Sequence, residues 1–455
     1  MTNLPVDFED TIVAISTPPG RGGIGIVRLS GPAARAIAEP LLKLRHPLAP
    51  AQARFAEIID STGETLDEAV VTYFEKPHSY TSEDIVEIAA HGSPVLLDYI
   101  LRQCIASGAR LAEPGEFTQR AFLSGRLDLT QAEAVSDLIE ASTLHQARIA
   151  AQQLGGSLSR QIAPIKQQLI SLIAALEAGI DFAEDDIDLL PTSEITRQIQ
   201  AIKVPLTALE QTFSYGRIVR EGFTLAIVGR PNAGKSSLFN QLIQRDRAIV
   251  TATPGTTRDP ITERVSLEGI PVELIDTAGL RDSTDEVESI GIAKSREAMA
   301  EADVVLLVLD ATTEIHEEDE AAIAASSLRP FLIVMNKIDL APGVQSTKRY
   351  ACPMLETSAL TGYGVSELRH AILSLLTKEA PTTETTLLTN LRQQQAVSAT
   401  LAALVRTQQA IDVTIPHEMI LLDLYEALNA LDTLTGNTTS DDILNLIFAK
   451  FCIGK

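Results

Sequence analysis

The chain has 455 residues, of which 45% are hydrophobic, so it is long enough for two or three domains that each bury a core. Its formal net charge of −23 excludes the broad positive surface that sequence-independent nucleic-acid binding requires. Aromatic residues make up only 4% of the chain and Trp is absent, which argues against a large base-stacking platform. Any RNA contact must therefore be local or made by a partner.

Cysteine usage and the chain's apolar runs indicate the compartment. Cys104, Cys352 and Cys452 lie too far apart for a CxxC metal or redox site, which suits a reducing cytoplasm. The N-terminal stretch MTNLPVDFED is acidic and lacks the apolar core of a signal peptide. No apolar run reaches the roughly 18 residues of a spanning helix. We expect a soluble, cytoplasmic protein with no membrane contact.

The first half of the chain predicts two kinds of structure. Residues 1–120 mix short β-type runs, such as TIVAIS and DIVEIAAHG, with glycine-rich turns and one helical stretch, PVLLDYILRQCIASG. This mixture is typical of an α+β or α/β domain. Residues 121–213 change to Ala, Leu, Gln and Glu at helical spacing, which predicts a helical segment.

The second half predicts an α/β domain followed by more helix. In residues 214–378, buried-strand runs such as FTLAIVG and VVLLVLD alternate with helical patterns, as expected of a parallel sheet. Residues 379–455 are helical again and too few for an independent core. We expect this tail to pack with residues 121–213, so that the α/β domain is inserted into a helical domain.

A phosphate-loop motif, GRPNAGKSS, occupies Gly229–Ser237 between a strand pattern and a helix pattern. The backbone N–H groups of such a loop surround phosphates, Lys235 neutralises the β and γ oxygens, and Ser236 offers its hydroxyl to Mg²⁺. A glycine turn that merely caps a helix is the weaker alternative in this context. The predicted contacts in the loop are Asn232, Ala233, Gly234, Lys235, Ser236 and Ser237.

Three further motifs indicate that the nucleotide is GTP. DTAG at Asp276–Gly279 follows a strand, so its carboxylate can hold Mg²⁺ through water. NKID follows another strand, and its Asp339 can accept both N–H donors on the guanine edge, which adenine would leave unpaired. TSAL adds a loop that can contact the base. The predicted contacts are Asp276, Thr277, Ala278, Gly279, Asn336, Lys337, Asp339, Ser358, Ala359 and Leu360.

The stretch TATPGTTRD lies where a mobile switch is expected, and Thr257 is the predicted second hydroxyl on Mg²⁺. Leu280 occupies the position where many related GTPases place the glutamine that orients water, so hydrolysis requires another group. Glu288 is our candidate, and Asn232 can help to bind a monovalent cation in place of an arginine finger. The switch contacts predicted for GTP are Thr251, Ala252, Thr253, Pro254, Gly255, Thr256 and Thr257.

Taken together, the motifs resemble the bacterial tRNA-modification GTPase family MnmE, also called TrmE. The resemblance covers essentially the whole chain: DTIVAISTPPGRGGIGIVRLSG near the start, EPGEFTQRAFLSGRLDLTQAEAV at the domain junction, the GTPase motifs, and FCIGK at the end. It implies an N-terminal folate-binding and dimerisation domain, a helical domain made of two chain segments, and a Ras-like GTPase domain inserted between them.

The resemblance also implies the reaction and its partners. Such proteins act as homodimers with the flavoprotein MnmG (GidA), in a heterotetramer or larger complex. Together they install a carboxymethylaminomethyl or aminomethyl group on carbon 5 of the wobble uridine, in the anticodon region of certain tRNAs. The carbon comes from 5-formyl- or methylene-tetrahydrofolate, and K⁺ stimulates GTP hydrolysis.

Site residues are carried over by matching motifs. Glu288 falls on the family's catalytic glutamate, and Lys235 belongs to the catalytic phosphate loop. The implied folate contacts are Arg28, Glu87, Arg126 and Lys455, while the implied K⁺ ligands are Asn232, Thr251, Thr253 and Thr256.

Cys452, in the terminal CIGK, has three interpretations. The stretch has the outline of a prenylation box, but its Lys455 end is unusual and no polybasic stretch precedes it. A buried cysteine that acts as a small hydrophobe is the common fate of a single thiol. The family's C-x-G-K signature instead favours a functional thiol near the folate site, whose reactivity depends on its local pKa.

Two other functions compete with a modifying GTPase. One is a switch protein, such as a ribosome-assembly GTPase, in which the nucleotide state only controls binding. The other is a folate-dependent aminomethyl transferase with a regulatory GTPase. Folate binding separates the switch protein from the other two.

Overall fold

The computed structural model describes residues 9–181, 190–243, 262–276, 302–326, 329–341, 350, 352–376, 386–413, 415–436, 447–448 and 451–454. The chain divides into two compact units. The first comprises Met1–Ser136, Leu154–Ser159 and Asp432–Lys455, and the second comprises Asp137–Gln153 and Arg160–Leu431. Within the described ranges, no helix combines the length and the apolar character needed to cross a membrane.

A seven-stranded sheet in the order β3-β4-β5-β6-β2-β1-β7 forms the centre of the first unit. Neighbouring strands are antiparallel except β1 and β7, which run parallel. The strands are β1 (Ile12–Ile15), β2 (Gly22–Ser30), β3 (Leu42–Leu44), β4 (Ala53–Ile59), β5 (Thr65–Phe74), β6 (Ile85–Gly92) and β7 (Arg110–Leu111).

Helices cover both faces of this sheet at β1. Helices α1 (Ala34–Ala38) and α2 (Pro94–Ala106) share a core with Val13, while Ile12 packs with Phe117 of α3 (Glu116–Leu123). Successive side chains of a strand point to opposite faces, so burial on both sides explains the uninterrupted apolar run of β1. Cys104 of α2 lies in the first core, and burial raises the pKa of its thiol to about 12. This thiol is therefore inert at neutral pH.

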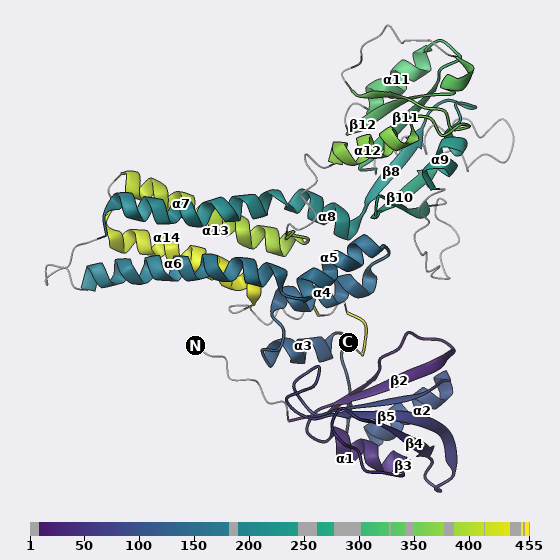
Figure 1. Ribbon diagram of the computed structural model, residues 1–455, viewed down its shortest axis with the longest axis vertical. Coiled ribbons are helices and arrows are strands. Elements are labelled where there is room, and N and C mark those ends of the chain that lie inside the picture. Colours follow the sequence, from purple (N-terminus) through teal and green to yellow (C-terminus); the bar gives the residue numbers. More distant parts are fainter. Residues whose placement is uncertain are drawn as a thin grey trace. The chain divides into compact units, whose positions relative to one another are not determined.

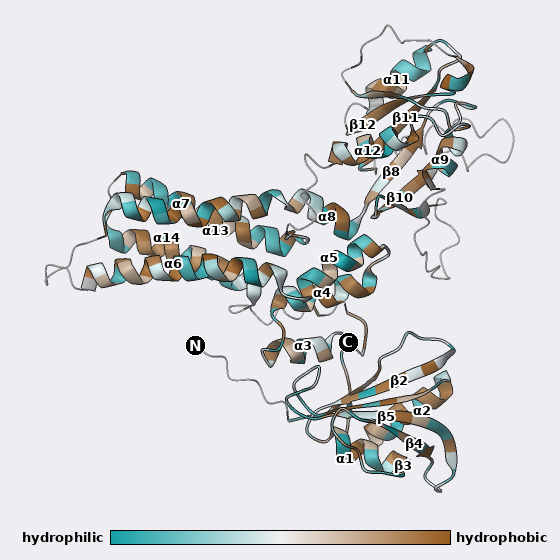
Figure 2. Cartoon of the chain, viewed as in Figure 1, coloured by the Kyte–Doolittle hydropathy of each residue, from teal (hydrophilic) through white to brown (hydrophobic). Residues whose placement is uncertain are grey.

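The sheet of the second unit has the order β13-β12-β11-β8-β10-β9. All neighbours are parallel except β9 and β10, which form an antiparallel hairpin. Brown, apolar residues follow its inner strands in Figure 2, as expected of strands buried on both faces. The strands are β8 (Phe223–Val228), β9 (Thr262–Leu267), β10 (Ile270–Asp276), β11 (Val304–Asp310), β12 (Phe331–Asn336) and β13 (Met354–Glu356).

Two core clusters, one on each face of this sheet, hold its helices in place. One cluster packs against α9 (Lys235–Ile243) and α12 (Val365–Leu376), and the other contacts α11 (Glu317–Ser326). The short η2 (Ile338–Leu340) follows β12. A parallel sheet with helices on both faces and a glycine loop after β8 is the phosphate-loop architecture that the sequence predicts.

Four long helices form a bundle in the second unit: α6 (Ser157–Asp181), α7 (Thr192–Gln211), α13 (Leu391–Asp412) and α14 (His417–Thr435). Figure 1 shows them side by side, although α6 and α7 precede the parallel sheet in sequence and α13 and α14 follow it. Helix α7 packs on α13, and Tyr425 of α14 donates a hydrogen bond to Glu177 of α6. The prediction of a helical domain assembled from two chain segments is confirmed.

Shorter helices lie near the junctions of the predicted segments: α4 (Leu129–Glu140), α5 (Leu144–Leu154) and α8 (Phe213–Glu221). The predicted boundary between residues 120 and 121 falls inside α3, and the one between 213 and 214 falls inside α8. The two compact units follow other divisions, so the three predicted boundaries between segments stay predictions.

Candidate functional site

The loop after β8 has the backbone of a phosphate cradle. Gly229, Asn232 and Gly234 have φ angles of +146°, +62° and +88°. A Cβ on Gly229 would lie 2.2 Å from the carbonyl oxygen of Val308, so only glycine permits this approach to β11. The loop is thus bent by left-handed residues that bring backbone N–H groups together at the start of α9, where anions bind.

Lys235 is 7% exposed, and its ammonium group lies within the loop. Its Nζ donates hydrogen bonds to the carbonyl oxygens of Gly229 and Arg230 at 2.9 and 2.8 Å. Ser236 is exposed in the first turn of α9, as a hydroxyl that reaches a phosphate-bound Mg²⁺ must be. Asn232 is also exposed, so its amide is accessible to a cation.

Asn336 joins the phosphate loop to the loop after β13. Its buried side chain donates from Nδ2 to the carbonyl oxygen of Ala233 at 2.9 Å, and its Oδ1 accepts the N–H of Ala359 at 3.0 Å. A Cβ on Gly234 would lie 2.2 Å from the same Nδ2. The side-chain amide of Asn336 therefore links three of the four predicted motifs: the phosphate loop, NKID and TSAL.

The NKID segment presents its aspartate outward. Lys337 has a φ of +66°, and its Nζ pairs with Asp310 at 2.7 Å, which fixes the turn at the end of β12. Burial would raise the pKa of Asp310, but its hydrogen bonds to Lys337 and Thr312 hold that pKa below its usual value. Asp339 is exposed in η2, where a base edge can reach it.

The TSAL residues follow β13. Ser358 is wholly buried, and its Oγ accepts the N–H of Thr361 at 3.1 Å. Ala359 is also buried, whereas Leu360 is 81% exposed. Of these residues, Leu360 is the most open to a base, while the buried Ser358 shapes the loop.

Asp276 ends β10, which pairs in parallel with β8, so its backbone lies beside the strand that leads into the phosphate loop. The other switch and magnesium predictions lie outside the described residues. They are Thr251, Ala252, Thr253, Pro254, Gly255, Thr256, Thr257, Thr277, Ala278, Gly279 and Glu288.

The first unit holds a second cluster. Arg28 of β2 and Glu87 of β6 are opposite each other in the antiparallel register. The Nε of Arg28 donates to Oε1 of Glu87 at 2.8 Å, and the two side chains are 16% and 25% exposed. The Arg28 side chain therefore lies in a largely covered ion pair.

The C-terminal segment reaches the same ion pair. The Nη1 of Arg28 donates to the carbonyl oxygen of Gly454 at 3.4 Å, and Ser16 Oγ donates to that oxygen at 3.1 Å. Gly454 has a φ of +96°, and a Cβ there would lie 2.6 Å from the carbonyl oxygen of Ile15. Glycine thus allows the terminal segment to dock against β1, which explains the glycine of the C-x-G-K pattern. Lys455 itself lies outside the described residues.

Cys452 is exposed and free, so the interpretation of a buried cysteine is wrong. Its carbonyl oxygen accepts the N–H of Gly115 at 3.5 Å, and the next residue, Ile453, bridges to Pro114. The thiol is thereby held on the segment that contacts Arg28.

Arg126 joins this cluster through an aromatic ring. The Cζ atoms of Arg28 and Arg126 lie 5.8 and 5.9 Å from the centroid of the Tyr80 ring. Arg126 is exposed, so its cation is accessible to a ligand. Three of the four residues predicted for folate therefore lie together, and the fourth follows Gly454 directly.

Two family models match this chain and show which family it belongs to. The model of the MnmE helical domain matches residues 129–452, and the model of the GTP-binding protein TrmE N-terminus matches residues 11–126. The chain belongs to the MnmE (TrmE) family. The tRNA modification GTPase MnmE of Koribacter versatilis (strain Ellin345) is 58% identical over 99% of this chain and 100% of its own length. Its namesake in Aquifex aeolicus is 42% identical over 98% of this chain and 100% of its own.

Membership of the MnmE family confirms the predicted family and its class of enzyme, a GTP hydrolase. The residue roles stay predictions. Sequence reasoning missed Tyr80 and its hydrogen-bond partner Thr118, because neither carries a motif. The only available signal was the resemblance around EPGEFTQRAF, which contains Thr118 without distinguishing it.

Sequence reasoning also missed the ion cluster beside the site. Arg120 is 1% exposed, and its guanidinium contacts carboxylate oxygens of Asp10, Glu83 and Glu116 at 2.8, 3.1 and 2.9 Å. Glu83 also accepts a hydrogen bond from the buried Ser30 at 2.7 Å. The cluster ties α3, which carries Phe117 and Thr118, to the segment before β6.

The pH dependence of stability follows from this cluster. Burial alone would raise the pKa of Glu116, but hydrogen bonds from Arg110, the Glu113 N–H and Arg120 hold that pKa below its ordinary value of 4.5. A carboxyl with a lowered folded pKa stabilises the fold above its unfolded pKa, and this contribution is lost as the pH falls through the folded value. We expect Glu116→Gln to lower the melting temperature most near neutral pH.

Differential scanning calorimetry of both chains between about pH 7 and about pH 2 measures this effect. The difference between the melting temperatures of the wild type and the variant should narrow as the pH falls below about 4.5. A difference in melting temperature that stays the same down to the lowest pH contradicts this role of Glu116.

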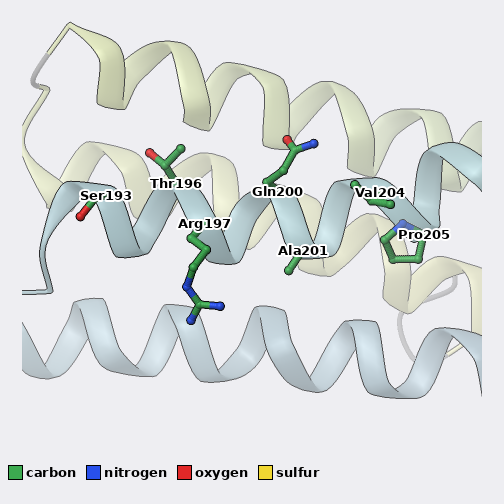
Figure 3. Close-up of a pocket in the computed structure, with 7 residues that line it drawn as sticks. All are labelled: Ser193, Thr196, Arg197, Gln200, Ala201, Val204 and Pro205. Carbon is green, nitrogen blue, oxygen red and sulfur yellow. The ribbon is translucent and has the colours of Figure 1, made fainter.

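A hollow along α7 is not a candidate for the chemistry. Figure 3 shows that α7 alone supplies its lining, and that these side chains do not converge on one point. Its one charged lining residue, Arg197, pairs with Glu194 at 2.5 Å. The lining is Ser193, Thr196, Arg197, Gln200, Ala201, Val204 and Pro205.

Proposed function

We propose that this chain hydrolyses GTP in order to drive the modification of carbon 5 of the wobble uridine in certain tRNAs. It would act as a cytoplasmic homodimer with the flavoprotein MnmG and add an aminomethyl or carboxymethylaminomethyl group. The carbon would come from 5-formyl- or methylene-tetrahydrofolate. The observation that carries this proposal is the gathering of Arg28, Glu87 and the Cys452 segment at one place in a chain that also has a GTPase loop.

In the nucleotide reaction, Lys235 would neutralise the β and γ phosphates, and Ser236 with Thr257 would hold Mg²⁺. The exposed Ser236 hydroxyl fits that role. Asn232, together with Thr251, Thr253 and Thr256, would bind K⁺, which supplies the positive charge that an arginine finger gives other GTPases. Glu288 would orient the attacking water.

In the folate site, the guanidinium groups of Arg28 and Arg126 and the ammonium of Lys455 would bind the carboxylates of the glutamate tail. Glu87 would accept N–H donors of the pterin. The C-terminal segment holds Cys452 close to this place, since Gly454 accepts a hydrogen bond from Arg28. The thiol would act on the one-carbon unit.

We propose that the partner supplies most of the positive charge that binds the tRNA. A net charge of −23 gives the chain no general attraction for a polyanion. A basic flavoprotein surface would supply it, while this chain contacts the anticodon region locally.

Replacing Cys452 by serine tests the function. We expect Cys452→Ser to hydrolyse GTP near the wild-type rate, because the phosphate loop lies in the other unit. The modified wobble uridine should disappear, because a serine hydroxyl is a much weaker nucleophile than a cysteine sulfur. Phosphate release measures the first effect, and mass spectrometry of tRNA nucleosides from a complemented deletion strain measures the second.

Ile453→Ser is the matched control. Ile453 is 50% exposed and lies in the same terminal segment, so this variant alters the segment and keeps the thiol. It should retain modification. If Cys452→Ser also retains modification, the thiol has no part in the reaction.

A further inference from the structure

The ring of Tyr80 contacts two cations. Its ring has the Arg28 guanidinium 5.8 Å and the Arg126 guanidinium 5.9 Å from its centroid. Phe117, which is wholly buried, has the Arg28 guanidinium 5.6 Å from its own centroid. An aromatic face attracts a guanidinium by about 0.5–1 kcal/mol at exposed positions and more when water is excluded. Shared contact with one ring therefore offsets part of the repulsion between the two arginines.

Arg28 and Arg126 differ in whether a carboxylate compensates their charge. Arg28 forms an ion pair with Glu87 at 2.8 Å, which compensates its charge. Arg126 is exposed, and no carboxylate pairs with it in the part of the chain that the structure describes. The ring of Tyr80 thus holds an uncompensated guanidinium near a compensated one.

The Tyr80 ring is itself fixed in position. Its hydroxyl oxygen lies 2.9 Å from Oγ1 of Thr118, which is wholly buried on α3. Burial raises the pKa of Tyr80, so the hydroxyl stays neutral. Because this hydroxyl is engaged with Thr118, the part of Tyr80 that faces the arginines is the ring rather than the proton donor.

We propose that Tyr80 is a positioning residue that holds Arg126 near Arg28, so that the Arg126 guanidinium receives a carboxylate of a glutamate tail. This rests on the proposed folate function and deepens it, because it adds a residue that positions Arg126 for the tail. Arg126 can bind a carboxylate through parallel N–H···O bonds, whereas Arg28 donates to Glu87 and to the Gly454 carbonyl and contributes its positive charge nearby. Tyr80 acts through the arginines and is not a catalytic residue.

The test compares two ligands, tetrahydrofolate and tetrahydropteroate, which lacks the glutamate. Isothermal titration calorimetry of the full chain gives the ratio of the two affinities. We expect Tyr80→Leu to lower this ratio about fivefold to thirtyfold, with a smaller change in the affinity for tetrahydropteroate. Tyr80→Phe keeps the ring and should lower the ratio less than about threefold.

Arg126→Gln removes an exposed cation, so it should fold normally and lower the ratio as Tyr80→Leu does. An unchanged ratio in either variant overturns the role of Tyr80, as does an equal loss in Tyr80→Phe and Tyr80→Leu. If the wild-type chain binds neither ligand, the proposed folate function fails and the inference fails with it. If the wild type binds both ligands equally, only the inference fails.

Discussion

Replacing Gly234 by alanine should weaken GTP binding by at least about a hundredfold, the loss expected when a binding loop is misplaced by about 1 Å. The φ angle at Gly234 is +88°, which an alanine adopts only with strain, and its Cβ would meet Nδ2 of Asn336 at 2.2 Å. The clash is relieved only if the loop or the amide moves. Either movement breaks the bond to Ala233 and frees the loop after β13.

Fluorescence titration with a labelled guanine nucleotide measures the affinity. Gly63→Ala is the matched control, because Gly63 has a φ of +87° and no atom lies within 4 Å of its Cβ position. This control carries the same backbone strain without the clash, and it should bind nucleotide normally. Normal binding by Gly234→Ala contradicts the proposed link through Asn336.

Arg120→Met should destabilise the first unit by about 3–5 kcal/mol, the usual loss when a buried ion pair keeps only one partner. Methionine fills much of the volume but leaves Glu83 and Glu116 buried without this cation. Arg110 still pairs with Glu116, so Glu83 bears the larger loss. Because α3 carries Thr118, the variant should also lose affinity for reduced folate.

Urea unfolding followed by far-ultraviolet circular dichroism measures the loss. Arg102→Met is the control, since Arg102 pairs with Asp98 at 2.7 Å on an exposed helix face, and it should cost less than about 1 kcal/mol. Equal stability of the Arg120 and Arg102 variants would show that the buried cluster contributes no more than an exposed pair.

The nucleotide site could be predicted from local sequence motifs. GRPNAGKSS needs only its strand, loop and helix to define a phosphate cradle, because the residues that form it are adjacent in sequence. The link from Asn336 to Ala233 spans more than one hundred residues, yet parallel strands end at one edge of a sheet. The sequence analysis placed both motifs after strands but did not predict this contact between them.

The second site depends on contacts that sequence patterns do not encode. Arg28 meets Glu87 because β2 and β6 pair in one register, and a shift of one residue would turn the pair to opposite faces. The resemblance supplied these two residues without the geometry. Tyr80 and Arg120 act through side chains from distant segments, and an isolated aromatic or arginine has no pattern that distinguishes it from a surface residue.

The environment of Cys452 could not be predicted from the sequence either. A single cysteine is most often buried, and the choice between a buried cysteine and a functional thiol depended on its surroundings. The backbone bridge at Ile453 and the tight glycine at Gly454 hold the segment that bears the exposed thiol, and neither follows from the motif alone.

The central claim is that the GTP loop in one unit and the Arg28 cluster in the other serve a single reaction. Quantifying modified wobble uridine in a deletion strain complemented with Gly234→Ala or with Arg28→Ala tests it most directly. We predict that both variants lose the modified nucleoside while the wild-type chain restores it. Full modification with Arg28→Ala would contradict the claim, because the cluster would then have no part in the chemistry that GTP hydrolysis drives.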